Sequence, residues 1–424
     1  MNRIVCVVLY VALATALAVC AMGQDDEKPV KINDVISMVP ATGNVYLVST
    51  PAGDVVIDTA IAEIAGEVKK VFDSEPHGKV KYIILTHAHA DHIGGISLWK
   101  EPGTEIIAQR NYVEFVNYVA RLEGFFIPRN AAAFNRAAPS SVRPWAGDFG
   151  GKIEPTILFD ENYKFKLGGV EFDLFSTPGE TPDHLTVWVP AYKAAFIGDN
   201  YFGITTPEPN SFPNLYAIRD TKPRWALDWI KSLDTVLALR PEIVLNGHGD
   251  PIVGNAEITR RLTRYRDAIQ YVHDETVKGM NAGKDVFTLM QEIKLPPQSD
   301  LTEIFGKVSW SVRGIYEGYA GWYDGNPSSM YELPPSSVYP DLVKLAGGPE
   351  PVARLAMEQI EAGKPVEALH LTDVVLTSDP QNASALKARI KAMEYLKQNT
   401  HNRIESGWLD YGLTLAKAKL ENTK

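Results

Sequence analysis

The chain has 424 residues, of which 45% are hydrophobic and 22% are charged, and its formal net charge is −10. This composition is ordinary for a globular protein with a sizeable buried core, and the length predicts roughly two to three domains. The acidic balance, without a basic patch interleaved with aromatic residues, argues against nucleic acid as a partner.

Residues 1–23 have the pattern of a secretory signal peptide. Arg3 supplies a positive charge, residues 4–19 are apolar, and a short cleavage site follows. We therefore expect a secreted or periplasmic protein with no membrane span after signal removal; a membrane anchor or a lipid on Cys20 is the alternative. Because Cys6 and Cys20 are the chain's two cysteines, any metal site of the mature protein must use His, Asp and Glu.

The first half of the mature chain predicts a layered α/β fold. Short β-rich runs, punctuated by glycine and proline, alternate with amphipathic stretches of helical periodicity. We expect strands at 45–48, 54–58, 81–85, 171–175, 185–189, 194–197 and 243–245, and helices at 61–72, 109–122 and 223–239. Strand-rich halves that carry outer helices are typical of an α/β sandwich.

Strand patterns end near residue 255, and the remainder predicts an all-α domain. We expect helices at 256–290, at 304–319 and from 349 to the end, with a proline-rich linker at 333–340. Residues 351–398 resemble one helical hairpin of tetratricopeptide type, which favours packing or dimerisation over a peptide groove. The mature chain therefore divides into an α/β domain, 24–255, and a helical domain, 256–424.

A dense set of possible metal ligands follows the strand expected at 81–85. Four such side chains lie within six residues: His87, His89, Asp91 and His92. This density is improbable for ordinary surface, and Gly94 and Gly95 let a helix start close by. Imidazole and carboxylate ligands without thiols suit zinc, with iron or manganese as alternatives. Solvated or helix-capping histidines are the alternative without a function.

This run resembles the H-x-H-x-D-H signature of the metallo-β-lactamase superfamily. The resemblance implies an αββα sandwich and further ligands downstream. Glu180, in a Pro-Gly-Glu-Thr turn, occupies the third position on metal 1, where most members have histidine. Asp199 fits the acidic residue that bridges both metals, and His248 fits the histidine after a late strand. Asp58 is expected to be a structural residue below the site.

The resemblance implies a site for two Zn²⁺ ions, or for other divalent metals. His87, His89 and Glu180 would bind metal 1, Asp91, His92 and His248 would bind metal 2, and Asp199 would bridge them. Asp91 and Asp199, with a metal-bound hydroxide, would form the catalytic centre without a separate nucleophilic side chain. Three alternatives stay open: His184 as the ligand in place of Glu180, Asp199 as a helix cap, and His248 as a structural histidine.

Two features indicate the alkyl sulfatase-like branch. Glutamate at position 180 is one, and the other is the string at 314–327, which closely resembles the hallmark of the alkyl sulfatase dimerisation region. The resemblance covers roughly residues 35–400. It implies a homodimer with an all-α, dimerisation-type second domain, and the cleavage of alkyl or aryl sulfate esters to alcohol and inorganic sulfate.

The same resemblance suggests where a sulfate ester binds. Residues 212–220 are similar to a His-Asn-Leu-Tyr-x-x-Arg segment, in which Asn214 and Arg219 would donate to sulfonyl oxygens. Arg313 and Tyr316 of the helical domain are further candidates. The alternatives are that these residues belong to an ordinary surface loop or to a salt-bridged helix and do not bind the substrate.

Three departures bear on the substrate. Pro213 replaces the histidine before Asn214, Trp310-Ser311 replaces a His-Asn pair, and the sequence stops at Lys424 without a sterol-carrier-like C-terminal domain. We therefore expect a small anionic ester rather than a dodecyl-type one, with C–O and S–O cleavage both open. The rival functions are a broad hydrolase of lactams, lactones or phosphodiesters, and a binding protein with a vestigial metal.

Overall fold

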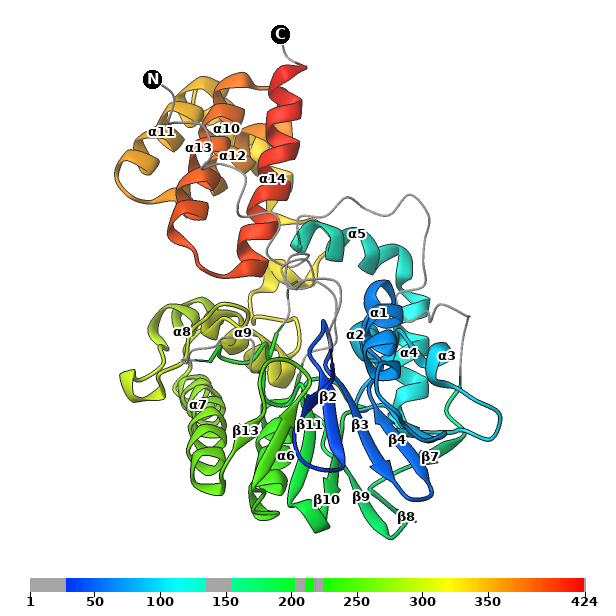
Figure 1. Ribbon diagram of the computed structural model, residues 1–424. Coiled ribbons are helices and arrows are strands. Elements are labelled where there is room, and N and C mark those ends of the chain that lie inside the picture. Colours follow the sequence, from blue (N-terminus) through cyan, green and yellow to red (C-terminus); the bar gives the residue numbers. More distant parts are fainter. Residues whose placement is uncertain (1–27, 135–153, 203–209, 217, 219–223, 423–424) are drawn as a thin grey trace, which may run out of the picture.

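A computed structural model of the protein describes residues 28–134, 154–202, 210–216, 218 and 224–422 (Figure 1). The expected signal segment and Arg219 lie outside the described residues. Among the helices within these ranges, none is both long and apolar enough to cross a membrane.

Two β-sheets form the centre of the molecule. The first contains β1 (Val30–Lys31), β2 (Ile36–Val39), β3 (Val45–Thr50), β4 (Gly53–Ile57), β5 (Val80–Ile84), β6 (Glu105–Gln109) and β7 (Ile157–Phe159), in that order across the sheet. The second contains β8 (Asn162–Leu167), β9 (Val170–Ser176), β10 (Leu185–Val189), β11 (Ala194–Gly198), β12 (Ile243–Asn246) and β13 (Ile252–Val253), in the order β13-β12-β11-β10-β9-β8. Their facing side chains form one core, which includes Ile57, Ile84, Phe172 and Phe196.

Helices cover the outer face of each sheet. The first sheet carries α1 (Ala62–Asp73), α2 (Ala90–Ile93), α3 (Ile96–Trp99) and α4 (Asn111–Arg121). The second carries α6 (Ala226–Ala238), α7 (Asn255–Asn281), α8 (Val286–Glu292) and α9 (Val308–Ala320). Strands β4, β10 and β11 are buried along their whole length because both faces are covered. The expected αββα sandwich is confirmed.

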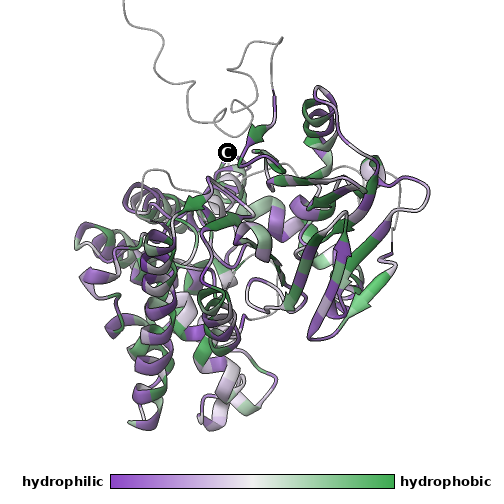
Figure 2. Cartoon of the chain, turned by 60° about the horizontal axis from the view of Figure 1, so that its bottom comes forward, coloured by the Kyte–Doolittle hydropathy of each residue, from purple (hydrophilic) through white to green (hydrophobic). Residues whose placement is uncertain are grey.

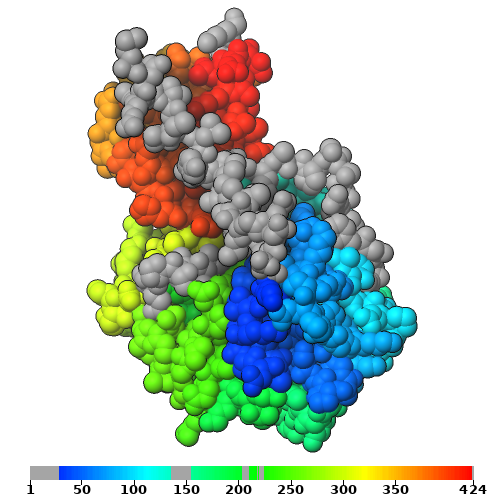
Figure 3. Space-filling model, in the orientation of Figure 1, coloured from blue at the N-terminus to red at the C-terminus, as the bar shows by residue number. Residues whose placement is uncertain are grey.

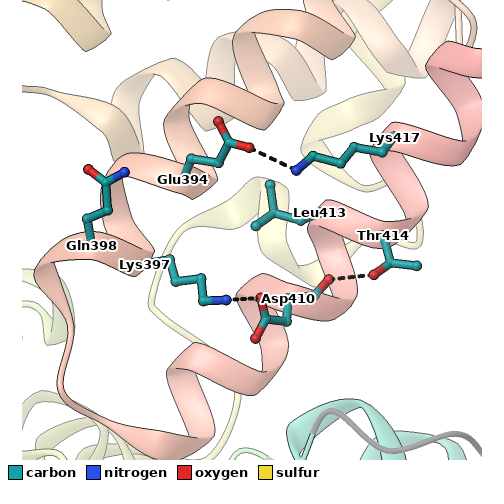
Figure 4. Close-up of a pocket in the computed structure, with 7 residues that line it drawn as sticks. All are labelled: Glu394, Lys397, Gln398, Asp410, Leu413, Thr414 and Lys417. Carbon is teal, nitrogen blue, oxygen red and sulfur yellow. Dashed lines mark hydrogen bonds and ion pairs between the residues drawn. The ribbon is translucent and has the colours of Figure 1, made fainter. Parts of the chain in front are cut away.

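Five further helices form a lobe above the sandwich (Figures 1 and 3). They are α10 (Tyr339–Leu345), α11 (Pro349–Glu361), α12 (Pro365–Ser378), α13 (Ala383–Asn399) and α14 (Arg403–Glu421). Along the helices that cover the sandwich, purple and green residues alternate in Figure 2, as expected where one face packs and the other meets water. Surface ion pairs join α13 to α14, between Glu394 and Lys417 and between Lys397 and Asp410 (Figure 4).

The lobe contacts the sandwich through α14 and α5 (Glu123–Ala133). Gly407 of α14 lies so close to α5 that an added Cβ would be 2.0 Å from the carbonyl oxygen of Ala133. Glycine therefore lets the two helices approach, and α5 is held between the sandwich and the lobe.

Several expected helices have different bounds in the structure; the helix expected at 304–319, for example, is α9 and begins at Val308. Gln109 ends β6 rather than beginning a helix, because its side chain is buried and its Oε1 accepts from the Asn111 amide at 2.6 Å. The helix expected at 256–290 is two helices, α7 and α8. Gly283 between them has a φ of +74°, and the Asp285 carboxylate caps the start of α8.

Candidate metal centre

The candidate ligands gather at one edge of the sandwich, each after the end of a strand. His87 and His89 follow β5, Asp199 follows β11, and His248 follows β12. Glu180 lies in the turn between β9 and β10. Strands β9 and β11 both run antiparallel to β10, and β12 runs parallel to β11, so the ends of β9, β11 and β12 meet at the same edge.

Backbone contacts fix the ligand-rich loop after β5. A Cβ added to Gly94 would lie 2.3 Å from the Ala62 amide nitrogen, and a Cβ added to Gly95 would lie 2.4 Å from the Thr59 carbonyl oxygen. The Gly94 amide donates to the Ala60 carbonyl at 2.9 Å. The two glycines therefore let this loop lie directly against the backbone of residues 59–62.

Six of the predicted ligands form two groups of three, and the donor atoms within each group lie within 4.8 Å of one another. The groups are His87, His89 and Asp199, and Asp91, His92 and His248. Asp199 also reaches the second group, because its Oδ2 lies 3.3 Å from His248 Nε2 and 3.9 Å from His87 Nε2. This position between the groups is the one expected of a bridging carboxylate.

Hydrogen bonds below the site orient the imidazoles. Asp58 Oδ2 accepts from His92 Nδ1 at 2.8 Å and from Thr86 Oγ1 at 2.7 Å, and its Oδ1 accepts from the Thr86 amide. Because His92 donates through Nδ1, its neutral form carries the Nε2 lone pair toward the cluster. Asp58 holds this position at a φ of +58°, which is unfavourable for a residue with a side chain.

The donor atoms fit a divalent cation. His92 Nε2 and Asp199 Oδ1 are both buried, lie 3.5 Å apart, and make no hydrogen bond within the described part of the chain. Buried polar atoms are seldom left in this state without a partner. Nitrogen and carboxylate donors in two adjacent groups suit zinc or a similar ion.

The charges of the cluster also favour a cation. Burial alone would raise the pKa of Asp199, but His248 and His92 hold that pKa well below its usual range. Burial alone would lower the pKa of His248, but Asp199 and Asp91 raise it to about 10. The carboxylates therefore stay ionised and attract positive charge, which bound metal would supply in place of protons on the histidines.

Glu180 and His184 both lie beside the first group. Glu180 Oε1 is 3.6 Å from His89 Nδ1, so one carboxylate oxygen faces the group. The His184 ring lies 5.2 Å from the His87 ring, and its Nδ1 is 3.3 Å from Thr177 Oγ1. Burial lowers the pKa of His184 to about 3, so this imidazole is neutral.

The predicted substrate residues have different surroundings. Asn214 is half-buried, and its carbonyl oxygen accepts from Arg224 Nη1 at 3.0 Å, whereas Arg219 lies outside the described residues. On α9, Arg313 pairs with Glu317 of the same helix, and Tyr316 packs against the core beneath the second sheet.

Arg224 is a site residue that the sequence analysis missed. Its guanidinium is buried and donates to Glu180 Oε2 at 2.5 Å. It occurs five residues after Arg219 in the same segment, and nothing in the local pattern distinguishes the two arginines. The contact with Glu180 depends on the return of the chain from β11 to α6, which sequence spacing does not encode.

An aromatic pair lies beside the second group. The ring of Phe202, three residues after Asp199, is 5.0 Å from the His248 ring and 5.2 Å from the ring of Phe305. Both phenylalanines are half-buried. Phe305 lies between α8 and α9, so the helical half supplies an apolar side chain close to the cluster.

Comparison with known proteins accounts for both halves of the chain. A family model of the metallo-beta-lactamase superfamily matches residues 38–248, and a model for alkyl sulfatase dimerisation matches residues 288–417. The chain belongs to the metallo-beta-lactamase superfamily. Its second half carries the alkyl sulfatase dimerisation region, so it is a member of the alkyl sulfatase-like branch.

Similar proteins include curated alkylsulfatases. A linear primary-alkylsulfatase of a Pseudomonas strain is 28% identical over 386 residues, which cover 84% of this chain and 71% of that protein. An alkyl/aryl-sulfatase of Saccharomyces cerevisiae is 25% identical over 390 residues, which cover 86% of this chain and 58% of the yeast protein. The chain thus spans little more than half of the length of the yeast enzyme.

A solved structure establishes the fold. The stereoselective inverting sec-alkylsulfatase Pisa1 from Pseudomonas sp. matches with a TM-score of 0.79 and 22% identity. The match covers 94% of this chain and 66% of that one.

Removal of the Asp58 carboxylate, which lies below the ligand cluster, should weaken metal binding. We expect Asp58→Ala to reduce Zn²⁺ affinity by about 10- to 100-fold, because His92 loses the partner that orients it. The measurement is competition for Zn²⁺ with a chromogenic chelator. Asp54→Ala, which removes a different buried carboxylate within β4, is the control and should leave Zn²⁺ affinity unchanged. Equal affinities of wild type and Asp58→Ala would contradict the orienting role.

Proposed function

We propose that this protein is an exported hydrolase that uses two divalent metal ions, preferably zinc, to cleave alkyl or aryl sulfate esters to an alcohol and inorganic sulfate. The observation that carries the proposal is the pair of donor groups joined by Asp199, with a carboxylate, Glu180, beside the first group. Relatives named as alkylsulfatases, 24–28% identical over 84–88% of this chain, support the substrate class. Export rests on the signal pattern of residues 1–23.

The proposed donor set covers both ions. His87, His89 and Glu180 would hold metal 1, Asp91, His92 and His248 would hold metal 2, and Asp199 would bridge them. Ions bound there would act as Lewis acids toward a sulfonyl oxygen and lower the pKa of a nearby water molecule. Two divalent ions carry more positive charge than the three carboxylates of the donor set, so the loaded site would favour an anionic ester.

The surroundings of the cluster suit an ester with one charged and one apolar end. Phe202 and Phe305 offer apolar surface next to His248, where the organic part of the substrate would pack. Asn214 and Arg219 are proposed as donors to the sulfonyl oxygens. Asn214 lies close to the first ligand group, because Arg224 joins its backbone to Glu180.

The dimerisation region supports a homodimer. Between Tyr319 and Leu345 several large apolar side chains are exposed, among them Trp322 at 75%, Leu333 at 74% and Leu345 at 83%. Exposed apolar side chains in such number on one stretch of chain are typical of a protein interface. We propose a second copy of this chain as the partner.

The assay that tests the function is sulfate release from short, branched, long-chain and aryl sulfate esters. Each ester is measured with the purified protein, after chelation, and after Zn²⁺ is restored. We expect release that chelation abolishes and Zn²⁺ recovers. We also expect His87→Ala and Asp91→Ala to lower kcat/KM by at least about 1000-fold, since two-metal catalysis contributes several kcal/mol to transition-state stabilisation.

His401→Ala is the matched control, since this histidine is exposed in the helical lobe. It should retain wild-type activity. No sulfate from any ester with zinc bound would contradict the proposal and favour the hydrolysis of lactams, lactones or phosphodiesters. Full activity of Asp91→Ala would overturn the site.

The dimer has its own test. We expect sedimentation to give the mass of two chains for the wild type and of one chain for the double variant Trp322→Asp/Leu345→Asp, because buried unpaired charge opposes association. Val253→Asp alters another exposed apolar side chain, on an edge strand outside the dimerisation region, and should leave the mass unchanged. A wild-type mass of one chain would contradict the dimer.

A further inference from the structure

Arg224 places a buried positive charge against the candidate metal centre. Its side chain is only 3% exposed, and that of Glu180 is 10% exposed. Arg224 Nη1 lies 2.5 Å from Glu180 Oε2 and 3.0 Å from the Asn214 carbonyl oxygen. Removal of one partner from such a pair leaves an uncompensated charge inside the protein, which is strongly unfavourable.

The two oxygens of Glu180 have separate surroundings. Oε2 accepts from Arg224, whereas Oε1 lies 3.6 Å from His89 Nδ1 and faces the first ligand group. The carboxylate thus accepts from Arg224 through Oε2, and its Oε1 is directed at the site. Without the guanidinium, rotation of the carboxyl group could present either oxygen or neither.

The backbone on both sides of this pair is fixed as well. The Glu180 amide donates to Asn200 Oδ1 at 3.1 Å, and Asn200 directly follows Asp199. The Arg224 amide donates to the Leu215 carbonyl at 3.1 Å. The turn that carries Glu180 and the segment that carries Arg224 therefore meet in one arrangement, and the contact is not a chance approach of long side chains.

Burial decides between two roles for this arginine. An arginine that binds the sulfate group must present its donors to the substrate, and a side chain that is 3% exposed offers very little surface for this. Its Nη1 donates instead to Glu180, a candidate ligand, and to the Asn214 carbonyl oxygen beside it. Arg224 is therefore a positioning residue.

We propose that Arg224 is what allows a carboxylate, rather than a neutral imidazole, to serve as the third ligand of metal 1. It balances the additional negative charge of Glu180 and fixes which oxygen faces the ion. This inference rests on the ligand role of Glu180 in the proposed function. It implies that the two residues depend on each other: a neutral ligand at position 180 needs a neutral residue at position 224.

The test compares Zn²⁺ binding to the full chain and its variants, by competition with a chromogenic chelator and by metal content after dialysis. We expect Arg224→Met to weaken the binding of one of two ions by about 10- to 100-fold. Glu180→His alone should also bind weakly, because Arg224 is left buried without its carboxylate. The double variant Arg224→Met/Glu180→His should recover most of the lost affinity, since both charges are removed together.

Two further variants separate this role from general damage to the fold. Arg224→Lys keeps the charge and should bind Zn²⁺ more tightly than Arg224→Met. Arg266→Met breaks the surface ion pair with Asp234 and should keep wild-type affinity. Thermal unfolding and circular dichroism identify variants that are folded.

The inference is overturned if folded Arg224→Met binds two ions with wild-type affinity, or if the double variant binds no better than either single variant. Glu180→Ala distinguishes this failure from failure of the proposed ligand set. Wild-type binding by Glu180→Ala would overturn both. Weak binding by Glu180→Ala with unchanged binding by Arg224→Met would overturn the role of Arg224 alone.

Discussion

The burial of the Asp199 carboxylate among His87, His92 and His248 is the constraint on which the rest of the site depends. A carboxylate removed from water is stable only beside positive charge. Its neighbours can supply that charge as protonated imidazoles, or a metal can supply it while the imidazoles stay neutral. Gly247 shows how closely the chain is built around this group, because an added Cβ there would lie 2.1 Å from Asp199 Oδ1.

The fold brings the other groups to this carboxylate from separate strands. Strands β9, β11 and β12 end at one edge, and the loop after β5 meets them there, so Asp91 and His248, more than 150 positions apart, become neighbours. Asp58 braces this loop from below. Arg224 braces the Glu180 turn from the side. Phe305, from the helical half, reaches the same edge through Phe202.

The sequence predicted the parts of the site that are local or that follow a strand end. The run from His87 to His92 is compact enough to interpret alone, and Asp199 and His248 each follow a strong strand pattern. Asp58 was expected below the site, and the structure places it there. The sequence predicted the layers of the fold but missed six of the strands that the structure describes, namely β1, β2, β6, β7, β8 and β13. In β6 the last residue, Gln109, lies where the helical pattern begins.

Arg224 could not be predicted in this way. Its partner Glu180 is 44 residues away, and the contact depends on how two irregular segments meet rather than on the periodicity of either. The helical pattern continues past the end of α7, so the sequence predicted one helix at 256–290. In the structure Gly283 and the Asp285 cap separate α7 from α8.

The most direct test of a paired site joined by Asp199 is anomalous diffraction at the zinc edge from crystals of the zinc-loaded protein. The account predicts two peaks per chain. One would lie beside His87, His89 and Glu180, the other beside Asp91, His92 and His248, and Asp199 would contact both. A single peak per chain, or a first ion bound by His184 with Glu180 turned away, would contradict it.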